Sequence, residues 1–107
     1  MKLKSRVAVV TGGARDLGRA ISVKLASEGD NVVINYYDNE ADALETLKQV
    51  QDAGSKGIIV QGDMTKAIDV KRVFDEAIKA FGTEIHILVN VVGGIVGRKT
   101  ITEQDED

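Results

Sequence analysis

The chain has 107 residues, a net charge of −3, no cysteine and one histidine. This length is enough for one domain, and charges of both signs spread along the chain leave no basic surface for nucleic acid. The missing cysteines exclude disulfides and thiolate metal sites, and no apolar run approaches the length of a membrane span. We therefore expect a cytoplasmic globular domain without a metal, nucleic-acid or membrane site.

The first predicted strand covers residues 7–10, where the apolar, largely β-branched run Val-Ala-Val-Val stops at Thr11. Two glycines, Gly12 and Gly13, follow, and an amphipathic helical pattern begins on their far side. A strand, a glycine loop and a helix in this order bring backbone N–H groups and a helix N-terminus up to a phosphate. The junction therefore predicts a phosphate-binding loop.

Three further apolar runs follow at regular intervals, at residues 32–34, 58–60 and 85–92. Each is short and almost free of polar residues, which is typical of parallel strands buried on both faces. Helical patterns lie between these runs. The order β-α-β-α-β-α-β predicts an α/β fold with a parallel sheet and right-handed crossovers.

Each helical pattern has an apolar stripe and its own end signals. Asp38 or Asn39 is expected to cap the second helix and Thr65 the third. A glycine suited to a left-handed cap follows each helix: Gly29, Gly54 and Gly82. The stripes predicted to face the sheet are Leu17, Ala20, Ile21 and Leu25, then Leu44, Leu47 and Val50, then Val70, Val73, Phe74, Ala77, Ile78 and Phe81.

The glycine loop is close to two nucleotide-binding motifs without matching either. The spacing from Gly13 to Gly18 nearly fits a P-loop, but Arg19 and Ala20 stand where that loop needs Lys and Ser or Thr. The three-glycine dinucleotide fingerprint has a different spacing.

A third pattern fits the loop better. The stretch TGGARDLG at residues 11–18 resembles the TGxxxGxG loop of the short-chain dehydrogenase/reductase family. Its context, VTGGARDLGRAI, is similar to the opening of bacterial 3-oxoacyl-[acyl-carrier-protein] reductases. Asp63 is similar to the family's adenine contact, and LVNVVG at residues 88–93 is similar to its LVNNAG segment. These matches cover the N-terminal part of the family.

The resemblance implies a Rossmann-like three-layer αβα fold with strand order 3-2-1-4, incomplete relative to the family. Residues 1–97 would form the N-terminal part of a dinucleotide-binding domain, and residues 98–107 either a polar acidic tail or the start of a truncated helix. The residues that it implies for cofactor binding are Gly12, Gly13, Ala14, Arg15, Asp16, Leu17, Gly18, Tyr36, Tyr37, Asp63, Met64, Asn90, Val92 and Gly93.

Two departures from the family pattern bear on binding. Asp16 replaces the middle glycine of the loop, where its side chain adds bulk and negative charge beside the phosphates. Asp16 is also suited to cap the N–H groups of the helix start, and we expect weakened but not lost cofactor binding. Val91 and Val92 replace an Asn and an Ala; either a hydrogen bond near the nicotinamide is lost, or the strand simply runs on.

The end of the second strand bears on the choice of cofactor. An acidic residue there would accept the ribose 2′-hydroxyl of NAD and repel the 2′-phosphate of NADP, but Asn35, Tyr36 and Tyr37 stand at that place. Arg15 is either a partner for the 2′-phosphate or a solvated loop residue. We expect NADP(H) in preference to NAD(H), with one tyrosine either stacked on the adenine or in the core.

The resemblance implies hydride transfer between NADP(H) and a carbonyl or alcohol, as in a 3-oxoacyl thioester reductase. The family's catalytic Ser and Tyr-x-x-x-Lys have no counterpart here, since Glu40 and Ala41 stand four residues after the two tyrosines. His86 is interpreted as structural, so we expect no catalytic residue and an inactive fragment of such an oxidoreductase. The alternative is a non-catalytic half-Rossmann module that binds a nucleotide or another chain, the latter covering an apolar edge strand at residues 85–92.

Overall fold

The computed structural model describes residues 6–82, 84–91 and 97–99 of the chain. Strands and helices alternate along it, as the apolar runs and helical patterns predicted. The elements in order are β1 (Val7–Thr11), α1 (Asp16–Ser27), β2 (Asn31–Tyr36), α2 (Glu40–Asp52), β3 (Gly57–Gln61), α3 (Ala67–Phe81), β4 (Ile87–Asn90) and β5 (Gly97–Lys99).

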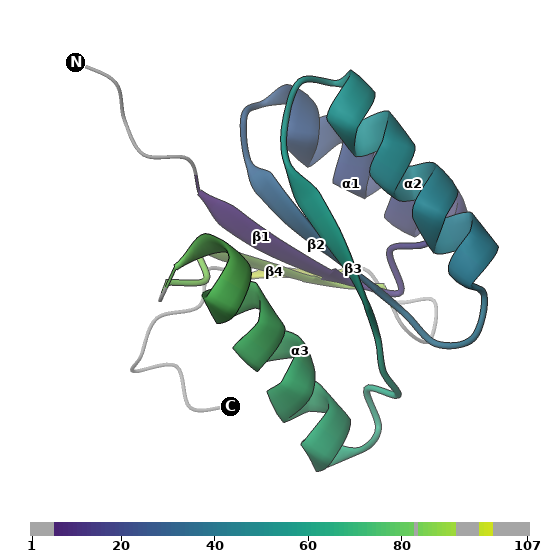
Figure 1. Cartoon of the computed structure of the whole chain (residues 1–107), viewed down its shortest axis with the longest axis vertical. Helices are drawn as coiled ribbons and strands as arrows, with labels where there is room; N and C mark the ends of the chain where they lie inside the picture. The colour runs from purple at the N-terminus through teal and green to yellow at the C-terminus, as the bar shows by residue number, and fades with distance from the viewer. Residues whose placement is uncertain (1–5, 83, 92–96, 100–107) are drawn as a thin grey trace.

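The strands form one sheet in the order β3-β2-β1-β4-β5, which confirms the predicted order 3-2-1-4 for the first four strands. These four run parallel, and Val9 of β1 is in register with Val33 of β2 and Leu88 of β4. Every residue of β1 is buried, because β1 lies between two strands and two helical layers. The carboxyl ends of the parallel strands therefore meet at one edge of the sheet (Figure 1).

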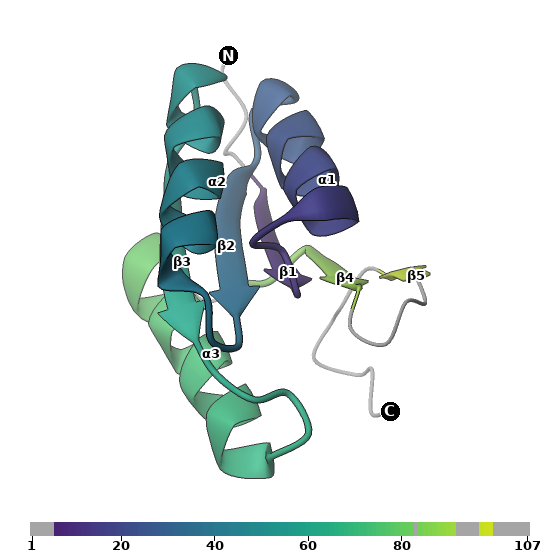
Figure 2. The ribbon, with the colours of Figure 1, turned by 90° about the vertical axis from the view of Figure 1, so that its right-hand side faces the viewer.

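Helices cover both faces of the sheet, which confirms the three-layer αβα architecture. Helices α1 and α2 lie side by side on one face, and α3 lies on the other (Figures 1 and 2). Side chains alternate between the faces along a strand. Ala8 and Val10 of β1 accordingly pack with residues of α1 and α2, whereas Val7 and Val9 pack with residues of α3.

The helices bury shorter side chains than their apolar stripes predicted. Leu17 is 50% exposed and Ala20 is exposed too, so the prediction that both face the sheet is wrong. The same holds for Leu44 in α2 and Ile78 in α3. Helix α1 turns small residues toward the glycine loop and the sheet, because a short side chain permits the closer approach that the tight loop requires. The buried residues of α1 are Gly18, Ser22, Leu25 and Ala26.

The helix ends follow the sequence signals in part. The glycine that follows each helix has a positive φ, as predicted: 95° at Gly29, 96° at Gly54 and 111° at Gly82. Asn39 caps α2, its side chain accepting the Asp42 N–H at 3.0 Å. The predicted cap of α3 is wrong: Lys66 occupies that position, with no side-chain cap.

Strand β4 is shorter than the strand predicted at residues 85–92. It ends at Asn90, so the interpretation that the strand continues into Val91 is wrong. The Val91 N–H nevertheless donates to the Thr11 carbonyl at 3.1 Å, which holds the chain against β1 for one more residue. Val92 lies outside the described residues.

Strand β5 was not predicted from the sequence. It pairs antiparallel with β4, and Leu88 is opposite Lys99. The expectation that the edge of β4 is open is therefore wrong for residues 88–90. Residues 98 and 99, assigned above to the polar stretch, belong to this strand, whereas residues 100–107 lie outside the described part of the chain.

His86 has the structural place that the sequence suggested. The Nδ1 of its side chain accepts the Val7 N–H at 3.0 Å, and the backbone N–H of His86 donates to the Val7 carbonyl at 2.9 Å. The side chain therefore satisfies a backbone donor at the start of β1 and lies at the end of the sheet opposite the glycine loop.

The described residues offer neither a membrane segment nor a metal centre. None of their helices combines the length and the apolar character that crossing a bilayer requires. Within the same residues, His, Cys, Asp and Glu side chains do not gather in groups of three or more that would hold a metal ion.

Candidate functional site

The glycine loop connects β1 to α1 through two very close contacts. A Cβ atom on Gly18 would lie 2.1 Å from the Gly12 carbonyl oxygen and 2.6 Å from the Gly13 Cα. A Cβ atom on Gly13 would lie 3.0 Å from the Val10 carbonyl oxygen. Gly12 has a φ of 68°, which favours glycine. The loop therefore turns so tightly that α1 begins directly above the end of β1.

The N-terminus of α1 offers backbone donors at this turn. Its first helical hydrogen bond runs from the Arg19 N–H to the Arg15 carbonyl, so the N–H groups of residues 16–18 have no partner within the helix. Arg15 is the N-cap residue and makes no side-chain cap, in contrast to Asn39 at the start of α2. Open donors and the positive end of a helix dipole fit a phosphate group.

Asp16 has the most unusual backbone in the site. Its φ is 55°, the left-handed region that glycine adopts without cost and most other residues avoid. Its side chain is 90% exposed and lies 4.0 Å from the Arg15 Nε. Because Asp16 lies inside the helix and not at its N-cap, the interpretation that it caps the helix is wrong. The positive φ also explains why the family pattern has glycine at this position, because glycine adopts that conformation without strain.

Asn35, at the end of β2, joins three strand ends through one buried side chain. Its Oδ1 accepts the Gly12 N–H at 3.2 Å, and its Nδ2 donates to the carbonyls of Val60 and Gly62, both at 3.2 Å. Its own carbonyl accepts the Gly13 N–H at 3.0 Å. From the sequence, Asn35 was expected only to be one of the residues that stand in place of an acid. Its signal was a lone amide at the end of an apolar strand, a position where a buried polar group needs partners.

Asn90, at the end of β4, lies at the same edge of the sheet. The Thr11 hydroxyl donates to the Asn90 Oδ1 at 2.9 Å, which connects the ends of β1 and β4. The structure thus brings this predicted site residue next to the glycine loop. Val92 and Gly93, the other predicted residues of this segment, lie outside the described residues.

The predicted adenine-side residues lie at or just after the ends of β2 and β3. Tyr36 is half-buried and Tyr37 is 62% exposed, so neither is enclosed in the core. Met64 is half-buried and packs against the apolar layer under α3. These residues occupy neighbouring strand ends, since the Gly62 N–H donates to the Tyr36 carbonyl at 2.9 Å.

Asp63 is part of a local turn with Thr65. Its carboxylate accepts both the Thr65 hydroxyl, at 2.6 Å, and the Thr65 N–H, at 2.9 Å. The hydrogen bond from the Thr65 hydroxyl is the main reason that the pKa of Asp63 lies below its usual value of 3.8. This turn explains why Thr65 does not cap α3.

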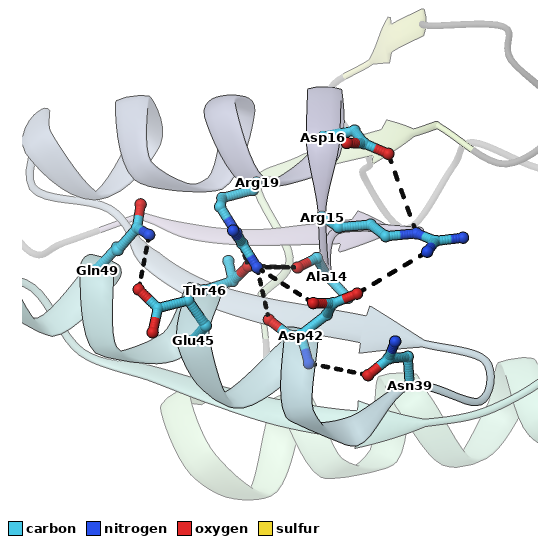
Figure 3. A network of polar contacts seen from close by, with 9 residues as sticks. All are labelled: Ala14, Arg15, Asp16, Arg19, Asn39, Asp42, Glu45, Thr46 and Gln49. Atoms are coloured by element: carbon cyan, nitrogen blue, oxygen red, sulfur yellow. Dashed lines mark hydrogen bonds and ion pairs between the residues drawn. The ribbon is translucent and has the colours of Figure 1, made fainter.

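Helix α2 is attached to the glycine loop by a polar network (Figure 3). The Arg19 Nε donates to the Thr46 hydroxyl at 2.8 Å, and the Arg19 Nη2 donates to the Ala14 carbonyl at 3.3 Å and the Asp42 carbonyl at 3.2 Å. The Thr46 hydroxyl also donates to the Ala14 carbonyl. Arg15 reaches the same network and is 67% exposed. This role of Arg19 was not predicted from the sequence, because Asp42 and Thr46 are distant from it in the chain.

The predicted site residues that the structure describes therefore gather at the carboxyl ends of β1, β2, β3 and β4. In open α/β sheets this edge, where neighbouring crossovers go to opposite faces, is the place where ligands bind.

Comparisons with known proteins agree with this geometry. The family model described as short chain dehydrogenase matches residues 6–107. The hydroxynaphthalene reductase-like protein Arp2 of Metarhizium majus (strain ARSEF 297) is 37% identical over 107 residues, a match that covers 98% of this chain and 40% of that protein. The chain thus spans about two fifths of the length of this curated relative.

Solved structures are similar as well. A putative dehydrogenase from Burkholderia cenocepacia with bound NADP superposes with a TM-score of 0.76 at 36% identity, covering 82% of this chain and 34% of that one. An NADH-dependent reductase complexed with NAD superposes with a TM-score of 0.72 at 27% identity, covering 79% of this chain and 35% of that one. Structures similar to this chain thus hold either cofactor.

Proposed function

We propose, since the chain belongs to the short chain dehydrogenase family, that it forms the cofactor-binding part of an oxidoreductase and that NADP(H) is its preferred cofactor. The observation that carries the proposal is the turn at Gly12 and Gly18, above which the N-terminus of α1 lies without a side-chain cap. A tight turn beside the open backbone N–H groups of a helix N-terminus suits a pyrophosphate.

In this proposal the residues of the chain bind and orient the cofactor. The N–H groups of residues 16–18 hold the pyrophosphate, and Asn35 keeps the loop in shape through Gly12. Residues at the ends of β2 and β3 face the adenosine, and Asn90 lies on the nicotinamide side. The bound nicotinamide would supply the hydride that passes to or from a carbonyl or alcohol.

Two observations support NADP(H) over NAD(H). At the end of β2, where an acid would mark NAD, stand Asn35, Tyr36 and Tyr37, none of which is Asp or Glu. Arg15 is mostly exposed and its ion-pair distances to Asp16 and Asp42 are 4.0 and 3.9 Å, so its guanidinium is loosely held. A loosely held arginine beside the loop is suited to a 2′-phosphate.

The finer parts of the proposal rest on the resemblance. We propose a 3-oxoacyl thioester or a related carbonyl compound as substrate of the complete enzyme, and no turnover by these 107 residues alone, because Tyr-x-x-x-Lys is absent from them. The second candidate is a module that binds the nucleotide without catalysis. A Tyr-x-x-x-Lys motif downstream in the reading frame that encodes this chain would favour the enzyme over the module.

Titration of the purified chain with NADPH and NADH, followed by nicotinamide fluorescence, tests the cofactor claim. We expect both to bind, NADPH more tightly. Arg15→Gln should weaken NADPH binding and leave NADH binding unchanged, because only NADPH carries the 2′-phosphate. The absence of binding of either nucleotide at millimolar concentration would overturn the proposal.

A further inference from the structure

Asp42, in the first turn of α2, lies between the two arginines of the glycine loop and α1. Its Oδ2 is 3.9 Å from the Arg15 Nη1, and its Oδ1 is 3.7 Å from the Arg19 Nη2 (Figure 3). The Asp42 side chain is 33% exposed, so this carboxylate is less screened by water than the exposed acids around it.

The two arginines differ in how firmly they are held. Arg19 is 27% exposed and donates to Thr46, to the Ala14 carbonyl and to the Asp42 carbonyl. Those contacts fix Arg19 as the link between α1 and α2. Arg15 is 67% exposed, and its ion pairs with Asp16 and Asp42 are at the long limit for such pairs. Of these two cations, Arg15 is the one that can turn toward an added anion.

The charge around Arg15 is balanced before any ligand arrives. Arg15 and Arg19 contribute two positive charges to the network, and Asp16 and Asp42 contribute two negative charges. A 2′-phosphate that approaches Arg15 therefore meets a carboxylate within about one ion-pair distance of the same guanidinium. A ribose with a free 2′-hydroxyl carries no charge and is indifferent to that carboxylate.

We infer that Asp42 is a specificity-determining residue, which competes with a 2′-phosphate for the guanidinium of Arg15 and so reduces the preference of the chain for 2′-phosphorylated over 2′-hydroxyl dinucleotides. The inference rests on the proposed function, which places the dinucleotide on the glycine loop. Asp42 opposes the preference for the 2′-phosphate that Arg15 provides. The selectivity of the chain therefore depends on the difference between the attraction by Arg15 and the repulsion by Asp42. Asp42 acts through Arg15 and is therefore a positioning residue.

The test compares dissociation constants for NADPH and NADH in the wild type and in Asp42→Asn. This variant keeps the size of the side chain and the backbone N–H that Asn39 accepts, and it removes the charge. We expect NADPH to bind about threefold more tightly, the size typical of one partly exposed ion pair, and NADH binding to remain the same. The gain should decrease at high salt, because the competing pair is screened.

The matched control is Glu45→Gln, which removes a negative charge from the next turn of α2. The Glu45 carboxylate accepts a hydrogen bond from Gln49, one turn further along α2 (Figure 3). It forms no ion pair with Arg15 among the described residues. We expect it to leave the ratio of the two constants unchanged. In an Arg15→Gln background, Asp42→Asn should have no effect on the ratio, because the group that it releases is absent.

The outcomes separate the inference from the function on which it rests. If the wild type binds neither nucleotide, the proposed function fails and the inference fails with it. If the wild type binds both and Asp42→Asn leaves the ratio unchanged, or weakens both equally, the inference alone is overturned. Should Asp42→Asn not fold, as judged by circular dichroism, Asp42→Ser is measured in the same way, with the same expected change of the ratio.

Discussion

A Cβ atom placed on Gly18 would lie 2.1 Å from the carbonyl oxygen of Gly12, although the two residues belong to a helix and to a loop. No side chain fits at that distance, so the start of α1 and the end of β1 touch through backbone alone. This contact sets how far the N–H groups of residues 16–18 stand from the turn, and so it determines the shape of the proposed phosphate site.

Gly18→Ala is expected to destabilise the chain and to remove nucleotide binding. The added methyl group forces α1 away from the loop, at a cost of about 1–3 kcal/mol in the free energy of unfolding, as for overpacked cores. Urea denaturation and the fluorescence titration with NADPH measure the two effects. Wild-type stability in this variant would show that the contact between Gly12 and Gly18 is not as close as described.

Gly29→Ala is the matched control for Gly18→Ala. A Cβ atom on Gly29 meets no atom within 4 Å, but the φ of Gly29 is 95°. The expected cost is therefore backbone strain alone, roughly 1 kcal/mol. Because Gly29 follows the other end of α1, nucleotide binding should remain.

Asp16→Gly is expected to stabilise the chain and to tighten binding of both cofactors. Glycine adopts a φ of 55° without the strain that Asp16 bears, which is worth about 1 kcal/mol. The ion pair with Arg15 that is lost is exposed on both sides and contributes little. Thermal unfolding and titration with NADPH and NADH measure the change.

Asp16→Asn separates the effect of charge on nucleotide binding from the effect of side-chain bulk at this position. Asparagine has the size of aspartate but no charge, so it removes the repulsion of phosphate and keeps the side chain. If the weakness of binding comes from charge, Asp16→Asn should match Asp16→Gly in affinity. If it comes from bulk, only Asp16→Gly should improve it.

Asn35→Leu is expected to be among the most destabilising single changes in the site. It leaves the Gly12 N–H and the carbonyls of Val60 and Gly62 without the buried partner that they have now. Unsatisfied buried groups cost about 1–3 kcal/mol each, so we expect a loss of at least about 2 kcal/mol in urea denaturation. Asn31→Ala, at the half-buried start of the same strand, should change stability by less than about 1 kcal/mol. Equal effects of the two variants would contradict the role of Asn35.

The pKa of Asp63 should rise toward its usual value of 3.8 in Thr65→Val, because the hydroxyl that stabilises the carboxylate is removed. A carboxyl with a lowered pKa in the folded state adds stability above its usual pKa and loses it as the pH falls through the folded value. The stabilising contribution is therefore complete above about pH 4 and disappears in stronger acid. Carboxyl NMR titration measures the shift, and Thr65→Ser, which keeps the hydroxyl, should retain the low pKa.

Much of the fold was predictable because it depends on local patterns. The β-branched runs identified β1, β2 and β3, and the glycines after the helices have the positive φ expected of them. Asn39 caps α2 as one of two residues proposed. Each of these features is set by neighbours within a few positions of the chain, and such neighbours can be recognised in one dimension.

The errors arose where burial is decided by elements that are distant in the chain. Leu17 and Ala20 continue the apolar stripe of α1, yet the helix turns Gly18 toward the loop and leaves both exposed. Strand β5 comes from residues whose polar composition gave no strand signal, and it is present because β4 offers an edge to pair with.

The sequence by itself determined the alternation of strands and helices, the strand order through its family resemblance, and a loop that only glycines can form. The tertiary structure alone decided that Asn35 joins three strand ends, that Asp16 has a left-handed backbone and that Asp42 lies between two arginines. Asn35 is 23 residues from Gly12 and 27 from Gly62. Contacts across such separations depend on strand register and helix docking, which no local pattern contains.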